Sequence, residues 1–159
     1  MIIRTRAARF FLVPALGIIW TVAAARTTTI DDSASQSLDP AVTLRWQTPA
    51  PGRRGPRADD ALVGAARVRV HLDLAPWLHR SGRIFLHLPA QPPGPIDMAW
   101  STQGRLGSGQ LRSGNRMLVF AGPIESPVLE ELFYFQFSID GRLLEGAAPV
   151  TYYFEMDED

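Results

Sequence analysis

Apolar and polar side chains alternate in short runs from Val42 to the end of the chain, and this two-residue period constrains the fold more than any other feature. A β-strand places successive side chains on opposite faces of a sheet, so the alternation is typical of strands with one buried face. The clearest run alternates four apolar residues with charged or polar ones: Val68, Val70, Leu72 and Leu74. No segment after residue 25 keeps a 3.6-residue period over three turns. The pattern therefore predicts an all-β protein.

Turn-forming residues divide the alternating runs into eight expected strands. These strands cover residues 42–46, 67–74, 84–88, 96–100, 110–112, 116–121, 131–139 and 150–156. The strand over residues 131–139 has apolar residues on both faces, so we expect it to be central in its sheet. Seven or eight short strands with frequent turns predict an antiparallel β-sandwich, immunoglobulin-like in the broad sense. A jelly roll or a small barrel is the alternative.

The first 25 residues have the features of a secretory signal peptide. Three arginines precede an uncharged, mostly apolar stretch over residues 10–25, which ends in three alanines. We expect cleavage after residue 25 and export to the periplasm or the medium. The alternative is an uncleaved inner-membrane anchor through residues 10–25, but a membrane-spanning helix needs about 20 apolar residues. The polar residues 26–40 then predict a flexible lead-in, followed by a single β-sandwich domain over residues 41–159.

Composition narrows what such a domain can do. The chain of 159 residues contains no cysteine, so its stability must come from a hydrophobic core and not from disulfides. All sixteen basic residues are arginine, as is typical of a GC-rich bacterial genome. Three of the sixteen lie in the predicted signal peptide, which leaves 13 against 16 acidic residues and a net charge of −3. We therefore expect no nucleic-acid partner, because its recognition uses a strongly basic surface.

Two histidines are the strongest candidates for a metal site. His71 and His87 fall on the outward faces of strands that we expect to form a hairpin around residues 75–82. Asp73, on the same face, is the best third ligand. A protein metal site usually has three or four ligands, and no cysteine can complete this one. Two solvated histidines are therefore the preferred interpretation, and we expect neither a metal nor another cofactor.

No catalytic constellation is predicted. The third histidine, His79, lies in a loop with no serine or carboxylate tied to it, and the Gly-x-Ser-x-Gly pattern of a hydrolase is absent. Glu130 and Glu131 are adjacent, so a strand turns them to opposite faces. A glycosidase needs two carboxylates that flank one bond. We therefore expect a protein that is not an enzyme.

Two aromatic residues are candidates for contact with a sugar. Trp77 lies in a polar loop between two expected strands, where its ring could stack on a sugar ring. A Trp in such a loop more often folds back over the end of the core, because Trp is highly buried on average. Tyr153 is out of phase with the apolar residues of its strand and is the second candidate. A carbohydrate-binding module that uses Trp77 is therefore the second hypothesis for function.

The first hypothesis is a non-enzymatic interaction or assembly module of the cell envelope or the medium, with another envelope protein or a glycan as its partner. Its expected contact surface contains Leu132 and Tyr134, apolar residues on the outer face of their strand. A positive loop is a weaker candidate, since a solvated loop is the preferred interpretation. That loop contains Arg53, Arg54 and Arg57. We expect anchoring in a membrane only if the N-terminal segment stays uncleaved.

Overall fold

The computed structural model describes residues 26–39, 42–47, 61–92, 94–143 and 149–158. The predicted signal peptide and the positive loop with Arg53, Arg54 and Arg57 lie outside the described residues. Within them, no helix is long and apolar enough to cross a membrane. The described chain consists mainly of strands, with two short 3₁₀ turns, η1 (Ala75–Trp77) and η2 (Gly141–Leu143).

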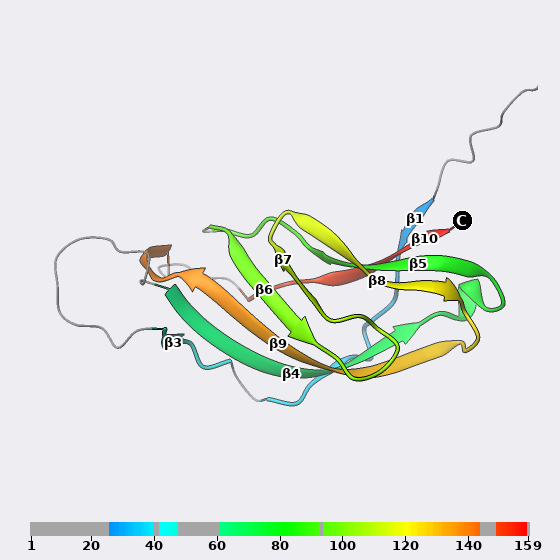
Figure 1. Ribbon diagram of the computed structural model, residues 1–159, viewed down its shortest axis with the longest axis horizontal. Helices are drawn as coiled ribbons and strands as arrows, with labels where there is room; N and C mark the ends of the chain where they lie inside the picture. Colours follow the sequence, from blue (N-terminus) through cyan, green and yellow to red (C-terminus); the bar gives the residue numbers. More distant parts are fainter. Residues whose placement is uncertain (1–25, 40–41, 48–60, 93, 144–148, 159) are drawn as a thin grey trace, which may run out of the picture.

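Two antiparallel sheets pack against each other and confirm the predicted β-sandwich (Figure 1). The smaller sheet, which we call sheet A, has the order β1-β10-β5-β8. Its strands are β1 (Thr27–Thr29), β10 (Tyr153–Glu158), β5 (Ser81–Leu88) and β8 (Asn115–Pro123). The larger sheet, sheet B, has the order β2-β4-β9-β6-β7, and β3 also pairs with β4. Its strands are β2 (Gln36–Ser37), β3 (Arg45–Trp46), β4 (Ala61–Asp73), β9 (Val128–Asp140), β6 (Ile96–Ser101) and β7 (Gly109–Arg112). The immunoglobulin-like description stays a prediction.

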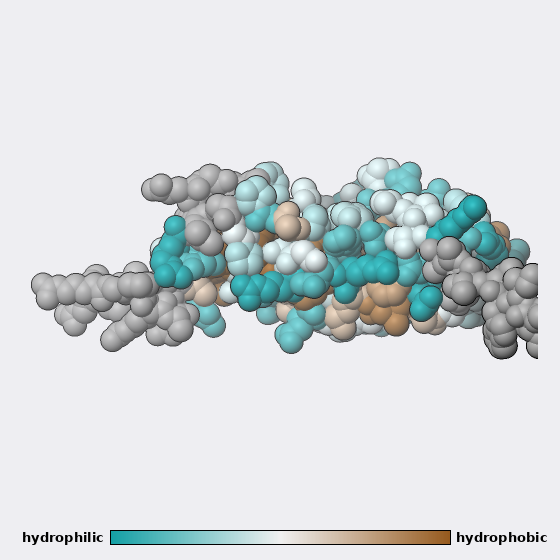
Figure 2. Space-filling model, turned by 90° about the horizontal axis from the view of Figure 1, so that it is seen from above, coloured by the Kyte–Doolittle hydropathy of each residue, from teal (hydrophilic) through white to brown (hydrophobic). Residues whose placement is uncertain are grey.

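The space between the sheets holds a hydrophobic core. On β9, four side chains that are at most 8% exposed face it: Phe133, Phe135, Phe137 and Ile139. β9 pairs with β4 on one side and with β6 on the other, so its predicted central position is confirmed. From sheet A, four fully buried side chains meet them: Ile84, Leu86, Phe154 and Met156. Most of the described surface in the view from above is hydrophilic or neutral, and hydrophobic side chains show only in small areas (Figure 2).

The residues just after the predicted signal peptide are not the flexible lead-in that their polar composition predicts. Thr27–Thr29 form β1, which pairs with β10 beside the C-terminus (Figure 1). Ile30 follows, is 1% exposed, and donates its backbone N–H to the carbonyl of Phe154 at 2.8 Å. Backbone pairing needs no apolar period, and a single buried isoleucine anchors this strand. The prediction over residues 26–40 is therefore wrong for this part.

β4 and β5 do not form the predicted hairpin. The chain leaves sheet B after β4, passes through η1 and enters sheet A as β5. Leu74 lies at this crossing, is 2% exposed, and donates its N–H to the carbonyl of Pro127 at 2.7 Å. In the sequence, Leu74 continues the two-residue alternation of β4, so the pattern predicts the last residue of a hairpin strand. The outward faces of β4 and β5 therefore lie on opposite sides of the sandwich.

Candidate functional site

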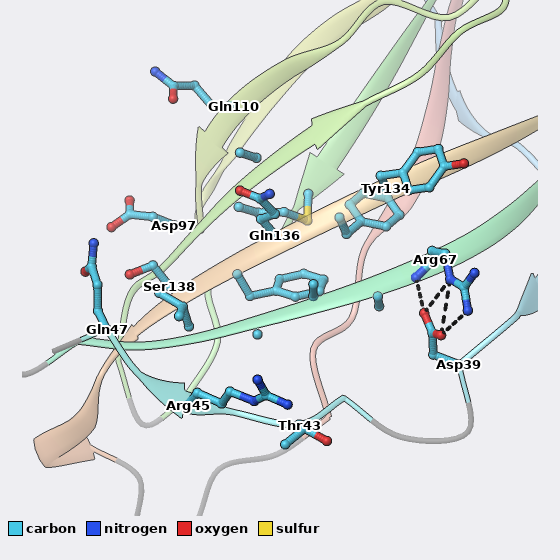
Figure 3. A pocket seen from close by; sticks show the side chains of 18 of the residues that line it. Asp39, Thr43, Arg45, Gln47, Arg67, Asp97, Gln110, Tyr134, Gln136 and Ser138 are labelled. Carbon is cyan, nitrogen blue, oxygen red and sulfur yellow. Dashed lines mark hydrogen bonds and ion pairs between the residues drawn. The ribbon is translucent and has the colours of Figure 1, made fainter. Parts of the chain in front are cut away.

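The outer face of sheet B is hollowed into an open groove of about 1220 Å³, which we call the sheet B groove (Figure 3). The groove crosses β3, β4, β9, β6 and β7, so it runs across the strands and not along one of them. β9 lies in its middle and contributes Tyr134, Gln136 and Ser138, the residues that alternate with the buried ones. On β9, the outward side chains of the groove therefore differ from the buried ones that hold the two sheets together, and the groove also reaches the core residues Phe135 and Phe137.

Small side chains in the middle of the sheet make this face hollow. Ala65 of β4 and Ala99 of β6 stand on either side of Gln136 in the strand register. Longer side chains stand on the outer strands, with Arg45 on β3 and Arg112 on β7. The alanines leave the amide of Gln136 accessible from both sides. Among the described residues, no side chain or backbone group forms a hydrogen bond with that amide.

The charged groups of the groove differ in how firmly they are paired. Asp39 accepts hydrogen bonds from the backbone N–H and the guanidinium of Arg67, at 2.6 Å and 2.8 Å (Figure 3). The side chain of Arg67, followed by its backbone N–H, holds the pKa of Asp39 below its ordinary value. Arg112 and Asp97 are looser, with 3.9 Å between Nε and Oδ1. Arg45 is exposed and has no carboxylate partner among the described residues. The described part of the groove thus contains one firm ion pair, one loose pair and one open guanidinium.

Tyr134 presents an aromatic ring to the groove. It is 40% exposed and lies opposite Arg67 in the register of β4 and β9. Leu132, two residues earlier on the same face, is half-buried. The structure therefore places both residues of the expected contact surface on the outer face of sheet B, and Tyr134 within the groove itself. That this surface contacts a partner stays a prediction.

Trp77 does not present its ring to solvent, which corrects its use as a platform for a sugar. It is 6% exposed and belongs to the hydrophobic core. Its indole Nε1–H donates to Oε1 of Glu158 at 2.9 Å, and the guanidinium of Arg80 pairs with the same carboxylate. These hydrogen bonds, with that of Trp77 first, hold the pKa of Glu158 below its ordinary value. Trp77 therefore takes the alternative role, a ring folded back onto the core.

Tyr153, the second candidate platform, is on the outer face of sheet A. It is half-buried, and its ring packs against the imidazole of His87 with 4.7 Å between the centroids. The ring is thus partly covered by a neighbour on the same face, and it lies on the side of the sandwich opposite the sheet B groove. Trp77 and Tyr153 do not combine into one sugar-binding surface.

The two candidate metal-binding histidines lie on opposite outer faces of the sandwich. Nδ1 of His71, on β4, lies 2.8 Å from Oε1 of Glu130. Nδ1 of His87, on β5, lies 3.2 Å from Oε1 of Glu155. Asp73 follows His71 on β4, and its Oδ1 accepts the first N–H of η1 at 3.0 Å. The two histidines cannot share a metal site, because the predicted hairpin that would bring them together does not form. In the described ranges, no three histidine or acidic side chains are grouped to hold a metal ion.

Two serines in turns and the adjacent glutamates Glu130 and Glu131 form hydrogen bonds within the fold. Ser108 and Ser113 each accept a backbone N–H at their hydroxyl oxygen, at 2.9 Å and 3.1 Å. Glu131 accepts two backbone N–H groups of the loop between β6 and β7, at 2.8 Å and 2.9 Å. Glu130 instead reaches His71 on the outer face of sheet B. The prediction that the two adjacent glutamates point to opposite faces is confirmed.

No protein-family model matches the sequence, and neither a curated protein nor a solved structure matches it. The sequence does not single out Arg45, Gln110 or Gln136, because alternation shows only that such residues point outward. The feature that marks the groove is the pair of alanines on either side of Gln136. These alanines can be recognised as neighbours of Gln136 only when the register of three strands is known.

Proposed function

We propose that the protein is an exported, non-enzymatic binding module and that the sheet B groove holds an extended glycan chain. The observation that supports this proposal most is an open groove that exposes several polar side chains, on a sheet whose other face already packs in the core. Concave sites with a few exposed, convergent polar groups are where proteins usually bind small molecules and chains. The polar groups of this groove contribute little to the core, so they are available to a ligand.

The chemistry of the groove suits sugar hydroxyls. Each hydroxyl both donates and accepts hydrogen bonds, and so do the amides of Gln110 and Gln136 and the hydroxyl of Ser138. The exposed ring of Tyr134 adds a flat face against which the apolar face of a sugar ring can pack. An apolar ligand would cover these amides without giving them partners, at a cost in free energy. A polyhydroxylated ligand is therefore favoured.

The groove is long enough for several sugar units. Adjacent strands of a sheet lie about 4.8 Å apart, so the five strands that it crosses span roughly 19 Å. It is open to solvent and not a closed cavity, so a chain can continue beyond it. A glycan lying across the strands would pass Arg45 on β3, Gln136 on β9 and Gln110 on β7 in turn (Figure 3).

Export would bring the module to the periplasm or the medium, where extended glycans are met. This part of the proposal rests on the predicted signal peptide. An envelope protein is the other candidate partner, since Leu132 and Tyr134 lie on the same face. The hot spots of protein interfaces are usually fully desolvated aromatic or arginine anchors. The middle of this groove instead combines small side chains with the exposed amide of Gln136 and the hydroxyl of Ser138, and these polar groups support the glycan.

A glycan array probed with residues 26–159 tests the proposal. We expect retention on at least one class of extended glycan. Tyr134→Ala should weaken that binding about tenfold, which corresponds to about 1.4 kcal/mol, because it removes the flat face. Tyr153→Ala is the matched control, since it removes the same side chain from the outer face of the other sheet.

The outcomes are separable. Weaker binding in Tyr153→Ala, with Tyr134→Ala unchanged, would move the site to sheet A and contradict the sheet B groove. Binding to no glycan by a protein that unfolds cooperatively would overturn the proposed function and favour a protein partner.

A further inference from the structure

We propose that the glycan is acidic, with carboxylates on its sugar units, and that Arg45 is the residue that binds one of these carboxylates. The inference rests on the proposed function, because it names the class of glycan that the sheet B groove takes. Two observations carry it: the distribution of charge in the groove, and the neighbours of Arg45 in the strand register.

The groove is more basic than the chain as a whole. Among the residues that the structure describes, three arginines and two aspartates line it: Arg45, Arg67, Arg112, Asp39 and Asp97. The whole chain has sixteen residues of each sign and no net charge. The groove thus carries a small positive excess on a domain that is otherwise neutral or acidic. Such an excess in a concave site attracts anions within a Debye length of about 8 Å.

Arg45 is the arginine of the groove that is most available to a ligand. The guanidinium of Arg67 is occupied by Asp39, which accepts from Nη2 at 2.8 Å and from Nε at 3.3 Å. Arg112 has Asp97 at 3.9 Å. Arg45 is exposed, and the described residues place no carboxylate within ion-pair distance of it. A planar guanidinium of this kind can bind a carboxylate through two parallel N–H bonds.

The neighbours of Arg45 suit a sugar acid better than a bare anion. Arg45 stands beside Val63 in the register of β3 and β4, and Val63 stands beside Ser138 in the register of β4 and β9. Figure 3 shows the side chain of Arg45 on the β3 side of the groove, with Ser138 and Gln136 further in. A carboxylate held at Arg45 would therefore have its sugar ring over an apolar valine and its hydroxyls directed toward a serine and an amide.

The two aspartates limit the charge that a ligand can carry. Asp39 and Asp97 line the same groove as Arg45. A densely sulfated chain would bring several negative charges close to these carboxylates and would be repelled. A polymer of uronic acids carries only one carboxylate on each sugar unit, and one of these carboxylates at Arg45 would match the open guanidinium. The groove therefore favours a polymer of uronic acids over a densely sulfated one.

Two acidic polymers and their carboxyl-reduced counterparts test the inference, because the two members of each pair share a backbone and differ only in having a carboxylate or a hydroxymethyl group on each reduced sugar unit. The probes are polygalacturonate and alginate, titrated into residues 26–159 in a calorimeter. We expect at least one acidic polymer to bind about tenfold more tightly than its reduced counterpart, as a charge-assisted hydrogen-bonded pair allows. Arg45→Gln should abolish this preference, so that the variant binds the acidic and the reduced polymer with equal affinity.

Arg83→Gln is the matched control. Arg83 is an exposed arginine on β5, on the outer face of sheet A, so its substitution removes the same charge from the opposite side of the sandwich. This variant should keep the full preference for the acidic polymer. The control thereby separates a contact at Arg45 from an effect of net charge.

The possible results distinguish this inference from the proposed function. Equal binding of the acidic and reduced polymers overturns the acidic ligand and leaves the glycan site standing. Equal losses in Arg45→Gln and Arg83→Gln, or equally tight binding of dextran sulfate, also overturn it, since both results show attraction of charge without a site. Binding to no polymer and to no glycan on the array overturns both.

Discussion

The outer faces of the two sheets carry similar side chains but pair them differently. On sheet A, Arg116 donates to Asp157 through both terminal nitrogens at 3.1 Å, and to Glu155 at 3.1 Å. The same guanidinium lies over the ring of Phe85, 4.2 Å from its centroid. His87 adds a contact to Glu155 at 3.2 Å. On sheet B, by contrast, the groove leaves a guanidinium, amides and a tyrosine ring open to solvent.

The length of the side chains that meet in register explains this difference. On sheet A, His87 stands between Arg116 and Tyr153, so long side chains contact each other across three strands. On sheet B, Gln136 stands between Ala65 and Ala99, which are too short to reach it. A polar group that is already paired gains little from a ligand, whereas a group paired only with water can gain a fixed partner. One face therefore serves stability, and the other is available for binding.

Breaking the hydrogen-bonded network on the outer face of sheet A should have the largest effect on stability. Arg116→Ala takes the bidentate partner from Asp157, which is 6% exposed. We expect the free energy of unfolding to fall by about 2 kcal/mol, the cost of leaving a charged group in a partly desolvated place without its hydrogen bonds. Urea denaturation measures this change.

Arg45→Ala is the matched substitution on sheet B. It should change the free energy of unfolding by less than about 0.5 kcal/mol, because the side chain is exposed and has no ionic partner among the described residues. If the two variants are destabilised equally, the groove arginine is structural and the distinction between the faces fails.

Filling the groove should have the next largest effect. Ala99→Arg places a long side chain beside Gln136, which closes the face in the way that long side chains close sheet A. We expect the affinity for the bound glycan to fall at least about tenfold, or about 1.4 kcal/mol. Leu118→Arg, at a position 45% exposed on sheet A, is the control and should bind normally. Unchanged affinity in Ala99→Arg would show that the ligand does not cross β6.

The fold could be predicted from the sequence because its signal is local. Alternation marks each strand by itself, and on β9 the side chains of Phe133, Phe135 and Phe137 are buried as their spacing requires. The pairing of strands could not be predicted in the same way. Leu74 continues the alternation up to the point where the chain changes sheets, so the pattern suggests a hairpin that does not form.

The groove could not be predicted, because what makes it is not local. Ala65 and Ala99 are far apart in the sequence and meet around Gln136 only because β9 lies between β4 and β6. An outward alanine gives no signal by itself. The outward position of Tyr134 followed from alternation alone, and so did the expectation that its face is a contact surface. The alternation therefore singles out the face of sheet B that carries the groove, but not the shape of the groove.

The smallest expected difference between the two faces is in how the free energy of unfolding changes at acid pH. Burial raises the pKa of Asp157, but hydrogen bonds from Thr27 and Arg116 outweigh burial and hold this pKa below its ordinary value of 3.8. The folded state therefore favours the ionised carboxylate. Its contribution to stability is present above a pH of about 4 and is lost as the pH falls through the lowered pKa. The gap in unfolding free energy between the native protein and Asp157→Asn should narrow from about pH 5 to about pH 2.

Asp39→Asn makes the same comparison on sheet B. Hydrogen bonds from the side chain of Arg67, and then from its backbone N–H, also lower the pKa of Asp39. The difference in unfolding free energy between the native protein and Asp39→Asn should therefore also narrow as the pH falls. The Arg67 side chain is 55% exposed, so solvent screens the pair, and we expect a smaller narrowing that added salt reduces further. Urea unfolding of both variants at several pH values, with and without salt, measures the two effects. A larger or more salt-resistant effect at Asp39 would mean that the ion pair beside the groove, and not the sheet A network, is the firmer one.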